Sequence, residues 1–360
     1  MTELDNGFGF LDKIKLFIIE QFKKMPKESF KIERSPINRK ESINISLKLV
    51  QEFIQVSKNL LDVQIKENIL FFYSVLNEKI PQEYLINFYN NVKTLCVNCN
   101  MIEPERMTNS DVYGEYCPKS NSISIVDAYD KNILFHELMH MASCASKGEK
   151  LFCGFEQSNN GQIIGTGLNE IFTCYFVEKY FGKSSDEATI VDLIPSFPIL
   201  FNKLVGESIE KYYFSSDLYG LINSIKPYAS DKDINNFIKD IDMFYFEIIK
   251  KRMGIDDWFF AIYDLKKVYR FLLKTYYVKC TLESELETEA SEKFEEFIGD
   301  IPFNIEIENG SIHIINNRDI DECISAAKKH LNRSSNSITR WNNSKQNVLF
   351  NFLSADKNSI

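Results

Sequence analysis

One group of residues has the types and spacing that suit metal chemistry: His136-Glu137-Leu138-Met139-His140. If this segment is helical, His136 and His140 lie one turn apart on nearly the same face, so both imidazoles can reach one metal ion. Glu137 lies between them, close enough to take a proton from a water molecule that the metal holds. The pattern predicts a hydrolytic zinc site with one Zn²⁺ per chain and Glu137 as the general base.

The alternative interpretation of this segment is a buried helix whose two histidines make ordinary hydrogen bonds. The expected helix is apolar on nearly every side, with Ile133, Leu134, Phe135, Met141 and Ala142 around the motif. Two imidazoles and a carboxylate are costly to bury in such a helix without strong partners. A bound metal ion supplies that partner, so we favour the metal site.

A catalytic zinc needs a third protein ligand and an open fourth position. Position 146, where one extended form of the motif has a third histidine, is Ser, so the third ligand must come from elsewhere. Glu170 is expected in the first turn of the next helix. Glu156 and Glu178 are rival acids, but neither follows an Asn at the start of that helix. We therefore predict that Glu170 joins the two histidines.

The segments around these residues resemble a known family. Residues 165–173 read Gly-Thr-Gly-Leu-Asn-Glu-Ile-Phe-Thr, and residues 121–125 read Asn-Ser-Ile-Ser-Ile. An H-E-x-x-H motif followed thirty residues later by Asn-Glu on a second helix resembles the gluzincin branch of the zincin metallopeptidases, the thermolysin-like type. The resemblance covers residues 110–182.

The resemblance implies that His136, His140 and Glu170 are zinc ligands and that Glu137 is the catalytic base. It implies an α+β fold of the zincin type, predominantly helical, with a small twisted sheet at residues 95–126 beside the motif helix. A peptide substrate would lie along the edge strand of that sheet. We therefore expect a zinc-dependent metallopeptidase that hydrolyses peptide bonds with a zinc-bound water, which Glu137 activates.

One position departs from the family pattern. Family members often carry an acid four residues after the third ligand, where it orients a liganding histidine, and this chain has Cys174 there. A thiol is a poorer hydrogen-bond acceptor than a carboxylate, and the partners of metal ligands tune metal affinity. Either another acid takes this place, or zinc is held more weakly.

Two other functions remain open. The first is a catalytically inactive, zinc-stabilised scaffold that binds peptides or proteins. Cys174 favours this alternative, because it replaces an acid that would orient a zinc ligand. The second is a zinc hydrolase that acts on a non-peptide amide or ester. Cleavage of peptides, of small amides or of neither would separate the three functions.

The sequence also predicts the elements that must hold the motif in place. Ile123 and Ile125 alternate with serines, which is the period of a half-buried strand. A helix is then expected from about Lys131 and, after a glycine-rich loop, a second helix from about Leu168 to Gly182. A loop of this length lets two antiparallel helices face each other, which places the third ligand opposite the two histidines.

We expect three regions along the chain. Residues 1–100 would form a mostly helical N-terminal region, residues 101–300 the zincin catalytic domain, and residues 301–360 a C-terminal hairpin, helix and polar tail. The expected smaller elements are a helix at 11–25, a polar linker at 26–41, helices at 42–78 and 82–95, further helices across 186–298, and a hairpin at 303–315 that turns at Asn309-Gly310.

Three other groups of metal-binding type are better explained without a metal. His313 is expected to pair with Glu306 across the hairpin. His330 lies near the end of a Lys-rich helix, where it suits the helix dipole; its alternative role as a transition-state hydrogen-bond donor is a weak hypothesis. Cys96 and Cys99 form a C-x-x-C, but no second pair follows to complete a zinc finger.

Overall composition restricts the partners and the location. The formal net charge is −9, which argues against general nucleic-acid binding, and no apolar run is long enough for stable membrane insertion. The N-terminus lacks the pattern of a secretory leader, so the cytoplasm is the expected location. The eight cysteines are accordingly expected to be free thiols. The expected partner is a peptide or protein substrate, and the oligomeric state is left undetermined.

Overall fold

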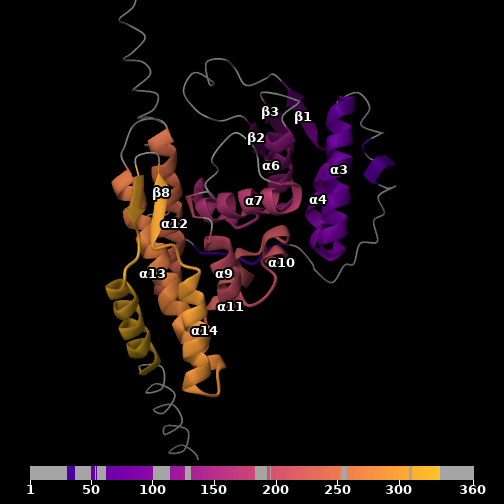
Figure 1. Cartoon of the computed structure of the whole chain (residues 1–360). Coiled ribbons are helices and arrows are strands. Elements are labelled where there is room, and N and C mark those ends of the chain that lie inside the picture. Colours follow the sequence, from indigo (N-terminus) through magenta and orange to yellow (C-terminus); the bar gives the residue numbers. More distant parts are fainter. Residues whose placement is uncertain are drawn as a thin grey trace, which may run out of the picture.

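The structure is a computed structural model of the chain. It describes residues 31–36, 50–52, 54, 62–99, 114–125, 131–182, 193–194, 196–252, 258–307 and 310–332. Most of these residues are helical and three small sheets accompany them, so the expected α+β class is confirmed (Figure 1). The predicted helix at 11–25 and the predicted polar tail lie outside the described residues.

Two of the described helices lie on either side of Pro81, before the first sheet. The first is α3 (Val63–Lys79), which begins after Asp62, whose carboxylate accepts a hydrogen bond from the backbone N–H of Gln64. A short 3₁₀ turn (Gln82–Tyr84) then leads into α4 (Ile86–Val92). The predicted helices on both sides of the proline are confirmed, although α3 and α4 are shorter than predicted over the residues described.

The first sheet has the strand order β1-β3-β2 and lies beside the motif helix, as expected. Its strands are β1 (Cys96–Cys99), β2 (Gly114–Cys117) and β3 (Ser122–Ile125). Strand β3 runs parallel to β1 and antiparallel to β2, which leaves β2 at an edge of the sheet. Ile123 and Ile125 are fully buried, which confirms the prediction of a half-buried strand with the isoleucines on its buried face.

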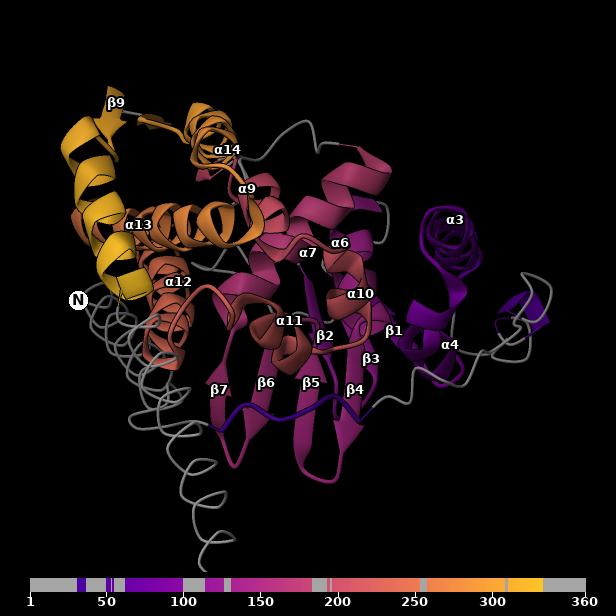
Figure 2. The same ribbon diagram turned by 90° about the horizontal axis from the view of Figure 1, so that it is seen from below.

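The two helices predicted to carry the metal ligands are present. Helix α6 spans Lys131–Ala142, and α7 spans Thr166–Phe181 and ends at Gly182, close to the predicted bounds. They pack against each other near the centre of the molecule (Figures 1 and 2). Helices α3 and α4 lie on one side of this pair, and α12 and α13 lie on the other.

The connection between α6 and α7 is a second sheet, so the expectation of a glycine-rich loop was wrong. Its four antiparallel strands follow one another in sequence order. They are β4 (Cys144–Lys147), β5 (Lys150–Cys153), β6 (Glu156–Asn159) and β7 (Gln162–Ile164). Gly154 and Gly161 lie in turns between the strands, whereas Gly165 and Gly167 lie at the start of α7. Strands of three or four residues show too few alternations to be recognised by period.

Cys144 and Cys153 form a disulfide, so the expectation that all cysteines are free thiols was wrong for this pair. The two residues lie directly opposite each other on β4 and β5. Residues paired in this way have Cβ atoms close enough for a bridge once the hairpin has formed. Their separation in sequence does not reveal this pairing, because the strands themselves were not predicted.

Residues 31–36 cross the second sheet and are bound to it (Figure 2). The backbone N–H of Glu33 donates to Gln157 Oε1 at 3.0 Å, and Gln157 Nε2 donates to the Glu33 carbonyl oxygen at 2.8 Å. The described part of the predicted linker at 26–41 has no helix or strand, as expected, but a buried side chain of β6 holds its backbone in place.

Beyond α7 the described chain is helical up to Gly299, as predicted for most of this region. The helices are α9 (Phe197–Val205), α10 (Ile209–Phe214), α11 (Leu218–Ile225), α12 (Asp231–Arg252), α13 (Trp258–Glu283) and α14 (Glu287–Gly299). Pro198 lies in the first turn of α9, where a missing N–H costs no helical hydrogen bond.

The predicted C-terminal hairpin is present with a different register. It consists of β8 (Asn304–Ile307) and β9 (Gly310–His313), and Gly310 already pairs with Ile307. The turn therefore lies one residue earlier than predicted. His313 consequently lies opposite Asn304, and its Nδ1 is 2.8 Å from Asn304 Oδ1, so the predicted pairing with Glu306 was wrong.

Buried side chains from all three predicted regions belong to one hydrophobic cluster, which extends from Val50 to Cys323. The division of the chain into three regions stays a prediction. In the described part of the chain, no helix is long and apolar enough to cross a membrane.

Helix α12 fixes the start of α7 through one buried carboxylate. Asp242 accepts hydrogen bonds from the backbone N–H groups of Gly165, at 2.9 Å, and Gly167, at 2.8 Å. A Cβ atom at Gly167 would lie 2.5 Å from the carbonyl oxygen of Ile241, so only glycine permits this close approach. Burial raises the pKa of Asp242 from 3.8 to about 7, although the two N–H groups act in the opposite direction.

We predict that Asp242 makes the stability of the fold depend on pH. The folded state binds this proton more tightly than the unfolded chain, so the free energy of unfolding falls as pH rises from about 4 to about 7. Asp242→Asn cannot ionise. Relative to the wild type, this variant should gain stability with rising pH by up to about 1.4 kcal/mol per unit. Urea unfolding at pH 5, 6, 7 and 8 measures the difference.

Asp231→Asn, at the exposed start of the same helix, is the matched control and should show no such trend. A difference between wild type and Asp242→Asn that stays constant with pH would contradict the prediction.

Candidate metal centre

Helix α6 places two histidines on a helix that is otherwise buried. Its buried residues are Leu134, Phe135, Glu137, Leu138, Met139, Met141 and Ala142. The side chains of His136 and His140 keep 26% and 12% of their surface exposed, and that of Glu170 on α7 keeps 19%. All three side chains are therefore mostly removed from water and still accessible from one side.

The structure brings the three predicted ligands together. His136 Nε2 lies 3.1 Å from His140 Nε2 and 3.3 Å from Glu170 Oε2. His140 Nε2 lies 3.3 Å from Glu170 Oε1. Of all the His, Cys, Asp and Glu residues that the structure describes, these three form the group that could hold a metal ion.

The spacing within this group fits a metal of the size of zinc. Ligand atoms about 2.05 Å from a tetrahedral ion lie about 3.3 Å from one another. In the structure the two Nε2 atoms lie 3.1 Å apart, and each lies 3.3 Å from a different oxygen of the Glu170 carboxylate. Two imidazole nitrogens and one carboxylate oxygen also form the donor set of several hydrolytic zinc sites. The group could therefore hold a metal ion.

The charges of the group are coupled. Burial acts to raise the pKa of Glu170, but the two imidazoles outweigh it and hold this pKa well below its usual value. Burial acts to lower the pKa of His136, but contacts with Cys174 and the carboxylates raise it overall. The ligand carboxylate is thus ionised, as metal binding requires.

Glu137 is buried on the side of α6 that faces β2, with 6% of its surface exposed. A Cβ atom at Gly114 would lie 2.9 Å from Glu137 Oε1, so this glycine lets the edge strand approach the carboxylate. The backbone of Tyr116 also forms a hydrogen bond with it. Burial raises the pKa of Glu137, although His136 and His140 attract its negative charge. Glu137 does not belong to the group of His136, His140 and Glu170.

His140 is oriented by a network from α7 and α10. Its Nδ1 lies 3.2 Å from Asn169 Nδ2 and 3.5 Å from Thr173 Oγ1. The Thr173 hydroxyl donates to the Asn169 carbonyl oxygen at 2.8 Å, so its lone pairs are available to an N–H on Nδ1. The Tyr213 hydroxyl contacts Thr173 Oγ1 at 2.6 Å. A proton on Nδ1 leaves Nε2 free to bind the metal.

His136 has a different partner. Cys174 Sγ lies 3.8 Å from His136 Nδ1, one turn after Glu170 on the same face of α7. The Cys174 thiol thus occupies the position beside His136 where family members often carry an acid. Because a thiol accepts hydrogen bonds weakly, His136 is held less firmly than His140.

The rival acids have other positions. Glu156 accepts a hydrogen bond from the Thr166 hydroxyl at 2.8 Å, which fixes the first residue of α7, and it does not join the ligand group. Glu178 lies two turns beyond Glu170 and also stays outside the group. Cys96 and Cys99 both lie on β1, and neither belongs to the metal group found among the described residues.

The remaining histidines and tyrosines do not contribute to the metal group. His313 lies on β9, and His330 lies on the last described helix, where its charge acts on Asp233. The Tyr212 hydroxyl donates to Glu207, and Tyr219 stacks under Arg34. The role of His330 as a transition-state donor stays a hypothesis.

Sequence reasoning missed the residues that orient His140. Asn169 and Thr173 are four residues apart on α7, so helical spacing could have placed both beside the ligand face. Tyr213 lies forty residues further along the chain, and no local signal connects it with the site.

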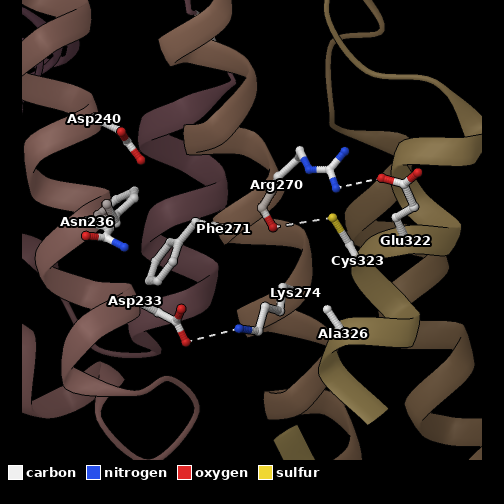
Figure 3. A pocket seen from close by; sticks show the side chains of 10 residues that line it. Asp233, Asn236, Asp240, Arg270, Phe271, Lys274, Glu322, Cys323 and Ala326 are labelled. Carbon is white, nitrogen blue, oxygen red and sulfur yellow. Dashed lines mark hydrogen bonds and ion pairs between the residues drawn. The ribbon is translucent and has the colours of Figure 1, made fainter. Parts of the chain in front are cut away.

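The described residues also form a groove away from the metal group, between α12, α13 and the last helix, residues 317–332 (Figure 3). Lys274 in this groove pairs with Asp233 at 3.0 Å, and Arg270 pairs with Glu322 at 2.8 Å. Because these charges are satisfied within the protein, we assign the groove no ligand.

We predict that Glu170→Ala greatly weakens metal binding. The wild type should bind one zinc ion per chain. The variant should lose more affinity than the roughly 10–100-fold that removal of a ligand's hydrogen-bond partner costs. Competition with a chromogenic zinc chelator measures both affinities. Glu178→Ala removes a carboxylate from the same helix and should leave zinc binding intact; equal binding by all three proteins would show that Glu170 is not a ligand.

We also predict that Cys174→Asp tightens zinc binding, by about tenfold, because a carboxylate accepts the His136 Nδ1 proton better than a thiol. Cys174→Ala removes the partner and should weaken binding. The same chelator competition compares the three chains. Equal zinc affinity in all three would show that this contact does not orient His136.

No protein-family model, curated protein or solved structure matches this chain. The assignment of a metal-binding group therefore rests on the residues themselves, on the two helices that carry them and on the distances between their ligand atoms.

Proposed function

We propose that this chain is a zinc-dependent metallopeptidase of the gluzincin type, with His136, His140 and Glu170 as zinc ligands and Glu137 as the catalytic base. The observation that carries the proposal is the convergence of His136, His140 and Glu170 next to a fourth group, the buried carboxylate of Glu137. The two Nε2 atoms lie 3.1 Å apart, and each lies 3.3 Å from a different oxygen of Glu170. A purely structural metal site has four protein ligands, whereas a catalytic site has three and an open position.

The nature of the donors favours zinc. Imidazole and carboxylate donors in a compact tetrahedral arrangement suit this ion better than Mg²⁺ or Ca²⁺, which prefer six or more oxygen ligands. When bound, zinc would lower the pKa of a coordinated water towards neutrality and polarise a substrate carbonyl.

The chain supplies the proton transfers and the orientation. Glu137 takes the proton from the attacking water and passes it to the leaving amine. The backbone of Tyr116 holds this carboxylate on the side of α6 that faces β2. Thr173 Oγ1 can accept a proton from His140 Nδ1, whereas Asn169 Nδ2 can only donate; the tautomer with its proton on Nδ1 would bind the metal through Nε2.

We propose a peptide or protein as the substrate because of the edge strand. Strand β2 lies at the edge of its sheet and approaches Glu137 at Gly114. An extended peptide can add to such an edge through backbone hydrogen bonds, which would bring a scissile carbonyl beside the base. The arrangement of an edge strand, a motif helix and a second helix that carries an acid is the one that the gluzincin resemblance implies.

The alternative is a catalytically inactive, zinc-stabilised scaffold that binds peptides or proteins. The observation that favours it is the contact of Cys174 with His136, where a weaker hydrogen bond leaves one ligand less well oriented. Such a scaffold would bind zinc and cleave neither peptides nor small amides.

For the location we propose the cytoplasm, on the sequence pattern alone. The Cys144–Cys153 disulfide weighs against it, because disulfides persist mainly in oxidising compartments. Alkylation of cells that express the chain, followed by mass spectrometry, shows whether this cysteine pair is reduced or oxidised. A reduced pair would agree with the cytoplasm, and an oxidised pair would indicate an oxidising compartment.

The central test of the proposed function is Glu137→Gln. This amide has nearly the shape of the carboxylate but cannot take a proton, so the variant should keep about one zinc per chain and lose peptide cleavage by at least about 100-fold. Cleavage of a broad peptide library, followed by mass spectrometry, measures the loss. Glu115→Gln on the exposed side of β2 is the control and should retain both zinc and cleavage.

Three outcomes are informative. Undiminished cleavage by Glu137→Gln would refute the mechanism. Zinc binding without any cleavage by the wild type would favour the scaffold. Cleavage of small amides but not of peptides would indicate a non-peptide hydrolase.

A further inference from the structure

Residues 31–36, which we call the crossing segment, are held by contacts of several kinds on the second sheet (Figure 2). Gln157 is the most specific of these partners. It is only 3% exposed, and both ends of its amide bind one residue: Oε1 accepts from the Glu33 N–H, and Nε2 donates to the Glu33 carbonyl oxygen. This arrangement imitates the paired hydrogen bonds of two antiparallel strands.

Side chains of the crossing segment are recognised as well. The Glu33 carboxylate forms an ion pair with Lys150 Nζ on β5 at 2.5 Å. The Ser35 hydroxyl donates to the carbonyl oxygen of Ser215 at 2.6 Å, and the Arg34 guanidinium lies 5.2 Å from the centre of the Tyr219 ring. Four groups of the segment are thus each contacted by a different residue of the rest of the chain, which we call the body. They are the Glu33 backbone, the Glu33 carboxylate, the Arg34 guanidinium and the Ser35 hydroxyl.

An apolar residue completes this surface. Phe152 lies directly opposite Gln157 on β5 and is only 2% exposed, and it lines one small cavity together with Lys31 and Glu33. Ile32 packs against the hydrophobic core. The crossing segment thus covers an aromatic side chain of the sheet, as a bound peptide does.

We propose that the surface formed by Lys150, Phe152 and Gln157 is a peptide-binding site and that residues 31–36 of the same chain are its ligand. The ligand class is a peptide with an apolar residue, an acid, a base and a hydroxyl residue in that order. Its non-covalent contacts with this surface are sufficient to hold the segment on the body, even without the covalent link between them. The N-terminal part of the chain therefore stays attached after a cut between this segment and the body.

The test uses the full chain with a cleavage site for a specific protease inserted within residues 37–49. After folding and cutting, native size-exclusion chromatography shows whether the N-terminal fragment travels with the body. We expect co-elution. Separation of the fragment from the wild-type body would overturn the proposal. Chelator is present throughout, so the result does not depend on the proposed zinc chemistry.

Substitutions in the crossing segment and in the sheet test recognition from both sides. Glu33→Lys changes only the ligand and faces Lys150 with a like charge, so it should weaken retention of the cut fragment at least tenfold. Combining it with Lys150→Glu should restore retention. Gln157→Ala should also release the fragment, whereas Gln162→Ala, an exposed glutamine on β7 of the same sheet, should not. Retention equal to wild type in both Glu33→Lys and Gln157→Ala would overturn the proposal.

Sedimentation of the uncut chain at two concentrations identifies the donor of the segment. A monomer agrees with a segment bound by its own chain. A dimer that dissociates when Glu33→Lys is introduced would show that a second copy donates the segment, and it would overturn the intramolecular assignment.

Discussion

The structure depends on holding three polar side chains together between two helices that are otherwise buried. Two imidazoles and a carboxylate meet where α6 and α7 face each other, and each would be costly to bury alone. The helices must therefore approach closely at fixed register. Gly154 serves this approach, because its positive φ and missing side chain leave room for Asn169 and Tyr213, the residues beside His140. Asp242 anchors the start of α7, and Asn91 Nδ2 binds the carbonyl oxygens of Met141 and Cys144 at the end of α6.

The sequence was most informative where local pattern and chemistry agree. Helical spacing set His136 and His140 on one face, and the Asn-Glu pair at the start of the next helix identified Glu170. The strand at Ser122–Ile125 followed from alternation alone, because one face of β3 is buried and the other is not. In these cases the residues that decide the structure are close together in sequence, so a single chain was sufficient to predict them.

Prediction was wrong where long-range pairing decides the structure. The strands between α6 and α7 are three or four residues long and largely polar, so their glycines indicated a loop. Without those strands, neither the Cys144–Cys153 bridge nor the place of residues 31–36 could be anticipated, because both depend on which strand lies beside which. The hairpin was predicted, but its register was not, since Asn309-Gly310 is a strong turn signal that the actual pairing does not use. Tyr213 reaches the site from another helix, and local pattern does not show such a contact.

The most direct test of the account is the position of the metal itself. Crystals grown with one equivalent of zinc and measured at the zinc absorption edge should show one strong anomalous peak. We predict that this peak lies about 2.0–2.1 Å from Nε2 of His136 and His140 and from a Glu170 carboxylate oxygen. A peak at cysteine sulfur, or none between α6 and α7, would contradict the account.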